Sequence, residues 1–239
     1  MDNYNRIING LKAYKEETNC KGVVVGISGG KDSTVVAMLL KKVWGDNVVG
    51  VIMPNGAQKD LQDALDIVKT INLKHYVIDI KETVDSIIKN SPVKLGDKEK
   101  SNIPPRVRMT NLYAIAQNLG YQVSGTSNLS ERYIGYTTKW GDSACDFNPI
   151  GKITCTMVIE LGKELAKEFG LDEKYIVKAP ADGLTGKTDE AVFGFTYQKL
   201  DKCIVRGYMT ETPADFAAMA KIEKRRRANE HKLRMPTII

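Results

Sequence analysis

The chain lacks the features that define several protein classes. No apolar run approaches the ~20 residues of a membrane-spanning helix, and residues 1–6 lack the apolar stretch of a signal peptide. The four cysteines form no Cys-x-x-Cys pair and there are two histidines, so a zinc site or redox dithiol is not expected. Scattered single thiols suit a reducing compartment, and we expect a cytoplasmic protein without a membrane segment.

The composition is that of an ordinary globular protein. The 239 residues are 42% hydrophobic and 27% charged, which suits one large α/β domain, and we expect a single domain over residues 1–239. The net charge of +6 fits nucleic acid or a small anionic substrate. The basic run at residues 224–227 has no interleaved aromatic side chains. It therefore reads as a solvated helix face, and no nucleic-acid partner is expected.

Alternating apolar segments predict an α/β fold, with a doubly wound, mostly parallel sheet flanked by helices. Strands are expected at residues 23–27, 48–53, 75–80 and 121–125, which are short apolar runs typical of buried parallel strands. Helices are expected at residues 2–19, 33–44, 61–71, 81–89, 104–119, 128–134, 154–169 and 213–234. Residues 90–101 read as a loop, and glycines within 180–189 predict a mobile loop. Strand signals become scarce after residue 126, so the C-terminal part is expected to be helical.

The loop between the first strand and its helix is the most informative segment. Backbone N–H groups and the dipole at a helix start favour an anion, and glycines permit close approach and positive φ. Ser28 and Ser33 can donate hydroxyl hydrogen bonds, while Asp32 beside a phosphate needs a cation such as Mg²⁺ between them. An ordinary glycine turn is the weaker alternative. The residues expected to hold the phosphates of ATP are Gly26, Ile27, Ser28, Gly29, Gly30, Lys31, Asp32 and Ser33.

The loop is not a Walker A motif, because Lys31 is followed by Asp32 rather than by serine or threonine. The pattern Ser-Gly-Gly-x-Asp-Ser after an apolar strand resembles the loop of the ATP pyrophosphatase group. That resemblance implies an adenine nucleotide alpha hydrolase-like fold. It also implies cleavage of ATP between its α and β phosphates, with transfer of AMP to an oxygen of the substrate.

Further segments resemble the ammonia-dependent NAD⁺ synthetases in order and spacing; they are residues 102–109, 125–131, 135–151, 186–190 and 230–232. The resemblance spans about residues 6–236. It implies a ligase that amidates deamido-NAD (nicotinic acid adenine dinucleotide) with ammonia to NAD⁺. ATP would activate the carboxylate as an acyl-adenylate, with release of pyrophosphate and then AMP. The resemblance also implies a homodimer with the dinucleotide at its interface.

The resemblance gives roles to individual positions near ATP. Asp32 and Glu131 would be catalytic and would bind Mg²⁺, and Thr126 would contact ATP. Alone, Glu131 would read as a solvated helix acid. Thr126 could equally be a strand-end hydroxyl that caps the next helix.

Contacts to deamido-NAD are implied for Arg106, Lys139, Asp146, His231 and Lys232. Without the motif, Arg106 would read as a surface charge. Lys139 could merely pack beside its aromatic neighbour Trp140. Asp146 stands between a cysteine and a phenylalanine, so partial burial is expected, with a substrate group as one candidate partner.

Two positions depart from the family pattern. A lysine of the ATP site falls at Cys155, and a serine or threonine falls at Ala181. Lys152, Lys178 or Lys187 could supply the missing charge. These departures keep open a non-catalytic or altered-specificity ATP- or dinucleotide-binding paralogue.

Two further expectations concern related enzymes. Another ATP pyrophosphatase, such as a tRNA-thiolating enzyme, is disfavoured because Cys-x-x-Cys is absent. The chain also has no room for a glutamine-hydrolysing amidase domain of about 250 residues. Free ammonia is therefore the expected nitrogen source, unless a separate subunit delivers it.

Overall fold

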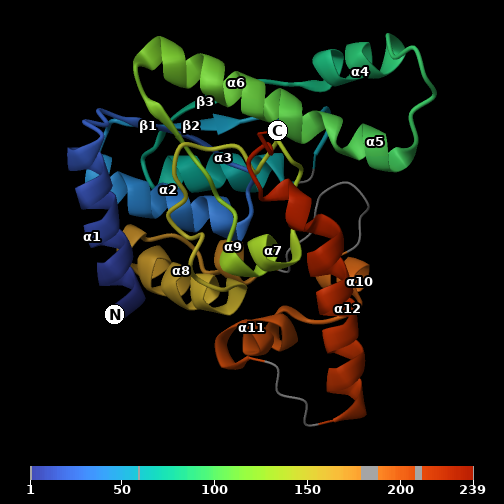
Figure 1. The fold of residues 1–239 in the computed structure, drawn as a ribbon. Coiled ribbons are helices and arrows are strands. Elements are labelled where there is room, and N and C mark those ends of the chain that lie inside the picture. Colours follow the sequence, from blue (N-terminus) through green and yellow to red (C-terminus); the bar gives the residue numbers. More distant parts are fainter. Residues whose placement is uncertain (1, 59, 179–187, 208–211, 239) are drawn as a thin grey trace.

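A computed structural model describes residues 2–238 except 59, 179–187 and 208–211 (Figure 1). Its sheet contains β1 (Val23–Gly26), β2 (Val48–Ile52), β3 (Lys74–Val77) and β4 (Gln122–Ser124). The strands are parallel and lie in the order β3-β2-β1-β4, with Val23 beside Val48 and Gln122. The predicted fold class, a parallel sheet flanked by helices, is confirmed.

Side-chain alternation along the strands divides the apolar residues between two cores, because successive residues point to opposite faces. One core contains Val23 and Val25 of β1. Its helices are α1 (Asp2–Glu17), α2 (Lys31–Trp44), α3 (Leu61–Thr70), α8 (Cys155–Phe169) and α9 (Lys174–Val177). The other core contains Val24 and lies under α4 (Lys81–Lys89) and α6 (Ile103–Leu119), which Figure 1 shows across the sheet.

A third apolar cluster lies away from the sheet, in the C-terminal part of the chain. It is built from α7 (Leu129–Ile134), α10 (Asp189–Phe193), α11 (Tyr197–Arg206) and α12 (Pro213–Asn229), and it also includes Cys155 at the start of α8. A short 3₁₀ helix, Glu230–Lys232, follows α12. These elements confirm that the C-terminal part is helical.

Several predicted boundaries are corrected by the structure. The helix after the glycine loop begins at Lys31 rather than near residue 33, and the last helix ends at Asn229 rather than 234. The expected loop at 90–101 ends in a short helix, α5 (Asp97–Ser101). Helices α9, α10 and α11 were not predicted. Most of the predicted loop at 180–189 lies outside the described residues, and Asp189 opens α10.

The described helices do not include one that combines the length and apolar character required to cross a lipid bilayer.

Candidate active site

The order in which strands are added to the sheet reverses between β1 and β4, which makes this the topological switch point. From β1 the chain crosses to β2 and β3 on one side, and then returns to pair β4 with the other edge of β1. The loops that follow β1 and β4 therefore part at the carboxyl edge of the sheet, which is where ligands bind in open α/β sheets. The glycine loop follows β1, and residues 125–128 follow β4.

The glycine loop needs glycine at one of its two central positions. Gly29 has φ 81°, and a Cβ there would lie 2.7 Å from the backbone oxygen of Asp60. Gly30 has φ −93° and ψ 162°, an extended conformation open to any residue. The expected positive φ is thus confirmed for Gly29 and wrong for Gly30.

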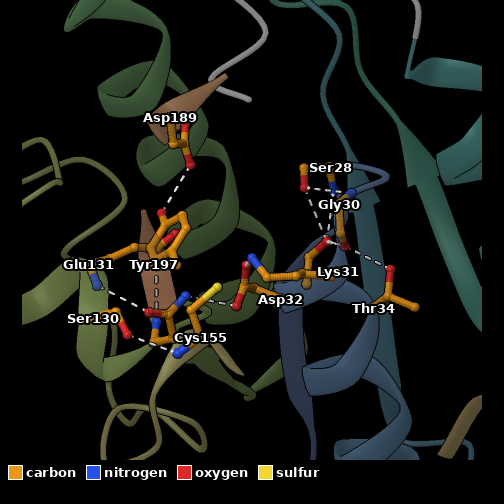
Figure 2. Close-up of polar contacts among 12 residues, drawn as sticks. Ser28, Gly30, Lys31, Asp32, Thr34, Ser130, Glu131, Cys155, Asp189 and Tyr197 are labelled. Carbon is orange, nitrogen blue, oxygen red and sulfur yellow. Dashed lines mark hydrogen bonds and ion pairs between the residues drawn. The ribbon is translucent and has the colours of Figure 1, made fainter. Parts of the chain in front are cut away.

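The two loop serines hold the loop itself. Ser33 Oγ accepts a hydrogen bond from the backbone N–H of Ser28 at 3.2 Å and donates to the carbonyl of Gly30 at 3.0 Å. Ser28 Oγ accepts from the backbone N–H of Gly30 at 3.2 Å, as Figure 2 shows. The hydroxyls of Ser28 and Ser33 thus fix the shape of the turn, and their predicted contacts to phosphate stay predictions.

Asn128 joins the two predicted metal-binding carboxylates. Its side-chain amide donates to Asp32 Oδ1 at 3.0 Å. Its own Oδ1 accepts from the backbone N–H of Glu131, and the carboxylate of Glu131 accepts from the backbone N–H of Asn128. Asn128 is therefore the N-cap of α7 in a capping box. The alternative reading of Thr126 as that cap is wrong, and Thr126 stays a predicted ATP contact.

The ammonium of Lys31 neutralises the negative charge of these two carboxylates only in part. Lys31 is only 3% exposed, and its ammonium lies 2.7 Å from Asp32 Oδ2. Burial alone would lower the pKa of Lys31, but the carboxylates of Asp32 and Glu131 outweigh it and raise that pKa, so the side chain is an ammonium. Burial and the charge of Asp32 raise the pKa of Glu131 well above its usual range. A further cation would therefore be accommodated here.

The donor set fits Mg²⁺. This ion prefers oxygen ligands and is commonly held through one or two carboxylates plus phosphate oxygens and water. Asp32 and Glu131 supply such carboxylates beside the glycine loop. Within the described residues, no group of three or more histidine, cysteine or acidic side chains forms a complete protein metal site. Phosphate oxygens and water would have to complete the coordination.

A tyrosine and an aspartate that sequence analysis missed also belong to this region. The hydroxyl of Tyr197 donates to Asp189 Oδ2 at 3.0 Å, and the hydroxyl of Tyr136 donates to Asp189 Oδ1 at 3.2 Å. Burial, followed by the charges of Glu131 and Asp189, raises the pKa of Tyr197, so its phenol keeps its proton. Asp189 opens α10 and Tyr197 opens α11, two helices that the sequence pattern did not predict.

Cys155 lies at the same site, at the first position of α8. Its backbone N–H donates to Ser130 Oγ at 2.8 Å, and Ser130 donates to the buried carboxylate of Asp201. Burial raises the pKa of the Cys155 thiol to about 12. The structure thus puts a neutral thiol where the resemblance led us to expect a phosphate-binding cation.

The candidate substitutes for that missing cation lie in different places. Lys178 pairs with Asp60 and, at 2.7 Å, with Asp63. Both aspartates lie against Gly29 in space. Lys152 is exposed. Lys187 and Ala181 lie outside the described residues.

Four of the five residues predicted to contact the dinucleotide form a second cluster. Arg106 donates to the carbonyl of Lys139 at 3.3 Å, and the Lys139 ammonium donates to the carbonyl of His231 at 3.0 Å. Lys232 donates to the carbonyl of Gly135 at 3.1 Å. Lys139 also lies 5.4 Å from the centre of the Trp140 ring, so the packing reading of Lys139 describes a real contact.

Asp146 is separate from these four in its described contacts. Its carboxylate accepts from the backbone N–H of Val123 at 2.7 Å and from the hydroxyl of Tyr113 at 3.3 Å. The residue is exposed, so the expected partial burial is wrong. Asp146 is held to the middle residue of β4, and its predicted substrate contact stays a prediction.

Known proteins resemble this chain over almost its whole length. The NH₃-dependent NAD⁺ synthetase of Carboxydothermus hydrogenoformans is 40% identical, with 98% of this chain and 95% of that protein covered. The solved structure of NMN synthetase from Francisella tularensis is similar with a TM-score of 0.90 and 32% identity, covering 100% of this chain and 97% of that one. The NH₃-dependent NAD synthetase of Campylobacter jejuni gives a TM-score of 0.77 at 30% identity, with the same coverage.

A family model described as NAD synthase matches residues 3–236. That match contains the glycine loop, the paired carboxylates and the cluster around Lys139. The chain therefore belongs to the NAD synthase family.

Proposed function

We propose that this protein is an ATP-dependent ligase that converts the nicotinate carboxylate of deamido-NAD to the amide of NAD⁺, with ammonia as the nitrogen donor. The observation that carries the proposal is the Asp32–Asn128–Glu131 arrangement at the switch point, beside the glycine loop. It occurs in a chain that the NAD synthase model matches over residues 3–236.

The chemistry proceeds in two balanced steps. A carboxylate oxygen of the substrate bonds to the α-phosphorus of ATP, and the bond to pyrophosphate breaks to leave an acyl-adenylate. The nitrogen of ammonia then bonds to the acyl carbon, a proton is lost, and AMP leaves. Activation is needed because a free carboxylate is a poor acyl donor, whereas AMP is a good leaving group.

Different residues would bind the phosphates, the metal ion and the acid substrate. The backbone of the glycine loop and the N-terminus of α2 would hold the phosphates, and Thr126 would contact ATP at the end of β4. Asp32 and Glu131 would hold Mg²⁺, which neutralises developing phosphate charge. Asn128 keeps Asp32 directed at the loop through its 3.0 Å hydrogen bond. Arg106, Lys139, His231 and Lys232 would bind the acid substrate, as would Asp146.

A second candidate substrate is nicotinic acid mononucleotide, with NMN as the product. The observation that favours it is the TM-score of 0.90 with the NMN synthetase of Francisella tularensis, against 0.77 with the NAD synthetase of Campylobacter jejuni. Both substrates carry the same nicotinate carboxylate, so the chemistry of the amidation is the same. They differ in the AMP half, which only the dinucleotide has.

One assay separates the two substrates. The purified protein is mixed with ATP, Mg²⁺, ammonium and either deamido-NAD or nicotinic acid mononucleotide, and kcat/KM is measured for amide formation from each. We expect NAD⁺ and AMP in equal amounts, with no product when ammonium is omitted. A higher kcat/KM for the mononucleotide would select the second candidate. No amide from either acid, in a protein that binds ATP, would overturn the proposal and favour a non-catalytic paralogue.

Further proposals follow from membership of the family. We propose a homodimer, which sedimentation or size-exclusion chromatography with light scattering tests directly, and a cytoplasmic location, which cell fractionation tests. We also propose a single domain over residues 1–239, in which the sheet and the two cores packed on it should unfold in one cooperative thermal transition.

A further inference from the structure

Lys31 is a charged side chain in an unusual position. Its side chain is almost fully buried, yet it belongs to the first turn of α2, immediately after the glycine loop. The helix dipole disfavours a cation in that turn. A buried ammonium at a helix N-terminus is costly, so a compensating charge is needed close by.

The charge present around Lys31 compensates it only in part. An ammonium has three hydrogen-bond donors, and within the described residues Asp32 Oδ2, at 2.7 Å, is its one acceptor. The ring of Tyr197 lies 5.6 Å from the ammonium and covers it on another side. Figure 2 shows Lys31 reaching from the loop toward Asp32, with the sulfur of Cys155 on the same side.

Burial raises the pKa of the Cys155 thiol, and the positive charge of Lys31 opposes that rise. Cys155 is only 1% exposed and is the first residue of α8. In this region Cys155 stands where the family pattern has a phosphate-binding lysine of the ATP site. The two alternatives that the structure describes fit less well, because Lys178 is held by Asp60 and Asp63, and Lys152 is exposed.

We propose that the Lys31 side chain is a phosphate-binding cation of the ATP site, and that it binds a phosphate oxygen of ATP when the nucleotide enters. This inference rests on the proposed ATP-dependent function. In the structure described here the ammonium is paired with Asp32. Mg²⁺ on the Asp32 carboxylate would compete with that pair, so Mg²⁺ and ATP arriving together would release Lys31 toward the phosphates. Cys155 is small and uncharged at the start of α8, and Lys31 supplies the charge from α2.

The first test measures binding rather than turnover. The dissociation constants of ATP and of adenosine are determined by calorimetry or NMR titration, with Mg²⁺ present, for the wild-type protein and for Lys31→Met. Loss of a charge-assisted hydrogen bond weakens binding by about 10- to 100-fold. We expect that loss for ATP and no more than about a 3-fold change for adenosine, which has no phosphate.

Lys42→Met is the matched control. Lys42 lies on the same helix, pairs with the carboxylate of Glu168 and contacts the ring of Phe169, but it is at the opposite end of α2 from the loop. Its substitution should leave the affinities for ATP and adenosine unchanged.

The second test moves the positive charge from position 31 to position 155 by substitution. The double variant Lys31→Met/Cys155→Lys returns an ammonium to the site from α8. We expect it to regain at least about 10-fold of the ATP affinity lost in Lys31→Met. If Lys31→Met does not fold because Asp32 has lost its partner, the double variant still tests the inference, since it returns a cation to the site.

Three results would overturn the inference. They are ATP affinity within 2-fold of wild type in Lys31→Met, equal losses for ATP and adenosine, and a folded double variant that regains no ATP affinity. Wild-type protein that binds no ATP would instead refute the proposed function.

Discussion

The side-chain amide of Asn128 donates a hydrogen bond to Asp32 over 3.0 Å, although the two residues are separated by 96 positions in the chain. The same asparagine caps α7 through the backbone of Glu131. One fully buried side chain therefore sets the helix that carries one predicted metal ligand and orients the other. Its two hydrogen-bonding roles can be separated by substitution.

Asn128→Ser should retain the cap and lose the bond to Asp32, because serine is a good N-cap but its hydroxyl is shorter than the amide. Asn128→Ala should lose both. We expect the alanine variant to be less stable than the serine variant by about 0.5–2 kcal/mol, measured by urea unfolding. Both should lose activity. A serine variant with wild-type kcat would show that orientation of Asp32 by Asn128 is unimportant.

Asp32→Asn should abolish measurable turnover, with a fall in kcat of about 100-fold or more. The neutral amide preserves shape and removes the carboxylate that would hold Mg²⁺. The check is a titration of activity against Mg²⁺ concentration, with circular dichroism to verify the fold. Full activity at the wild-type Mg²⁺ requirement would refute the metal assignment.

Lys139→Ala should raise KM for the acid substrate by about 10-fold, the effect expected for one charge-assisted hydrogen bond, and should change KM for ATP much less. Lys139 belongs to the cluster with Arg106 and His231, apart from the glycine loop in its described contacts. Steady-state kinetics with each substrate varied in turn gives both constants. Equal increases would argue against a substrate contact at Lys139.

Gly29→Ala and Gly30→Ala form a matched pair in one loop. A side chain at Gly29 meets φ 81° and a backbone oxygen at 2.7 Å, whereas one at Gly30 meets only Ser28 Oγ, at 3.3 Å. Positive φ alone costs an L-residue about 1–2 kcal/mol. We expect weaker ATP binding and a Tm lower by several degrees for Gly29→Ala, with near wild-type behaviour for Gly30→Ala. Equal effects of the two substitutions would contradict the loop conformation.

Cys155 should resist alkylation in the folded protein at neutral pH. Its pKa of about 12 keeps it a thiol there, and its side chain is buried, whereas the reactive species is the thiolate. Mass spectrometry after brief iodoacetamide treatment should find Cys145 and Cys203, which are partly exposed, modified first. Raising the pH toward 12 should increase labelling of Cys155. Rapid labelling at pH 7 would mean that the site opens readily.

The sequence predicted the sheet and most long helices because their signals are local. Valine-rich strands and helices such as α6, which begins at its prolines, are encoded within a few neighbouring residues. Asp32 and Glu131 were predicted together from the family resemblance, and in the structure both follow strands at the same edge of the sheet. Helices α9 to α11 were missed because they are short, polar at several positions and stabilised by tertiary packing rather than by intrinsic propensity.

The missed site residues share that cause. Asn128 appeared in a motif, but its bond to Asp32 depends on how the chain returns to β4. Tyr197 and Asp201 reach the site from α11, which the sequence did not predict. Conversely, the predicted burial of Asp146 was wrong because neighbours in sequence do not determine which side of a loop faces solvent.

Tyr197 and Cys155 contact the site and are also members of the C-terminal apolar cluster, which is separate from the two cores on the sheet. Regions with their own small core can open without global unfolding. Gentle heating should therefore inactivate the enzyme while the sheet is still intact. Substitutions at Leu200 or Ile222, inside that cluster, should lower the temperature at which activity is lost. They should lower the temperature at which the secondary structure melts by less.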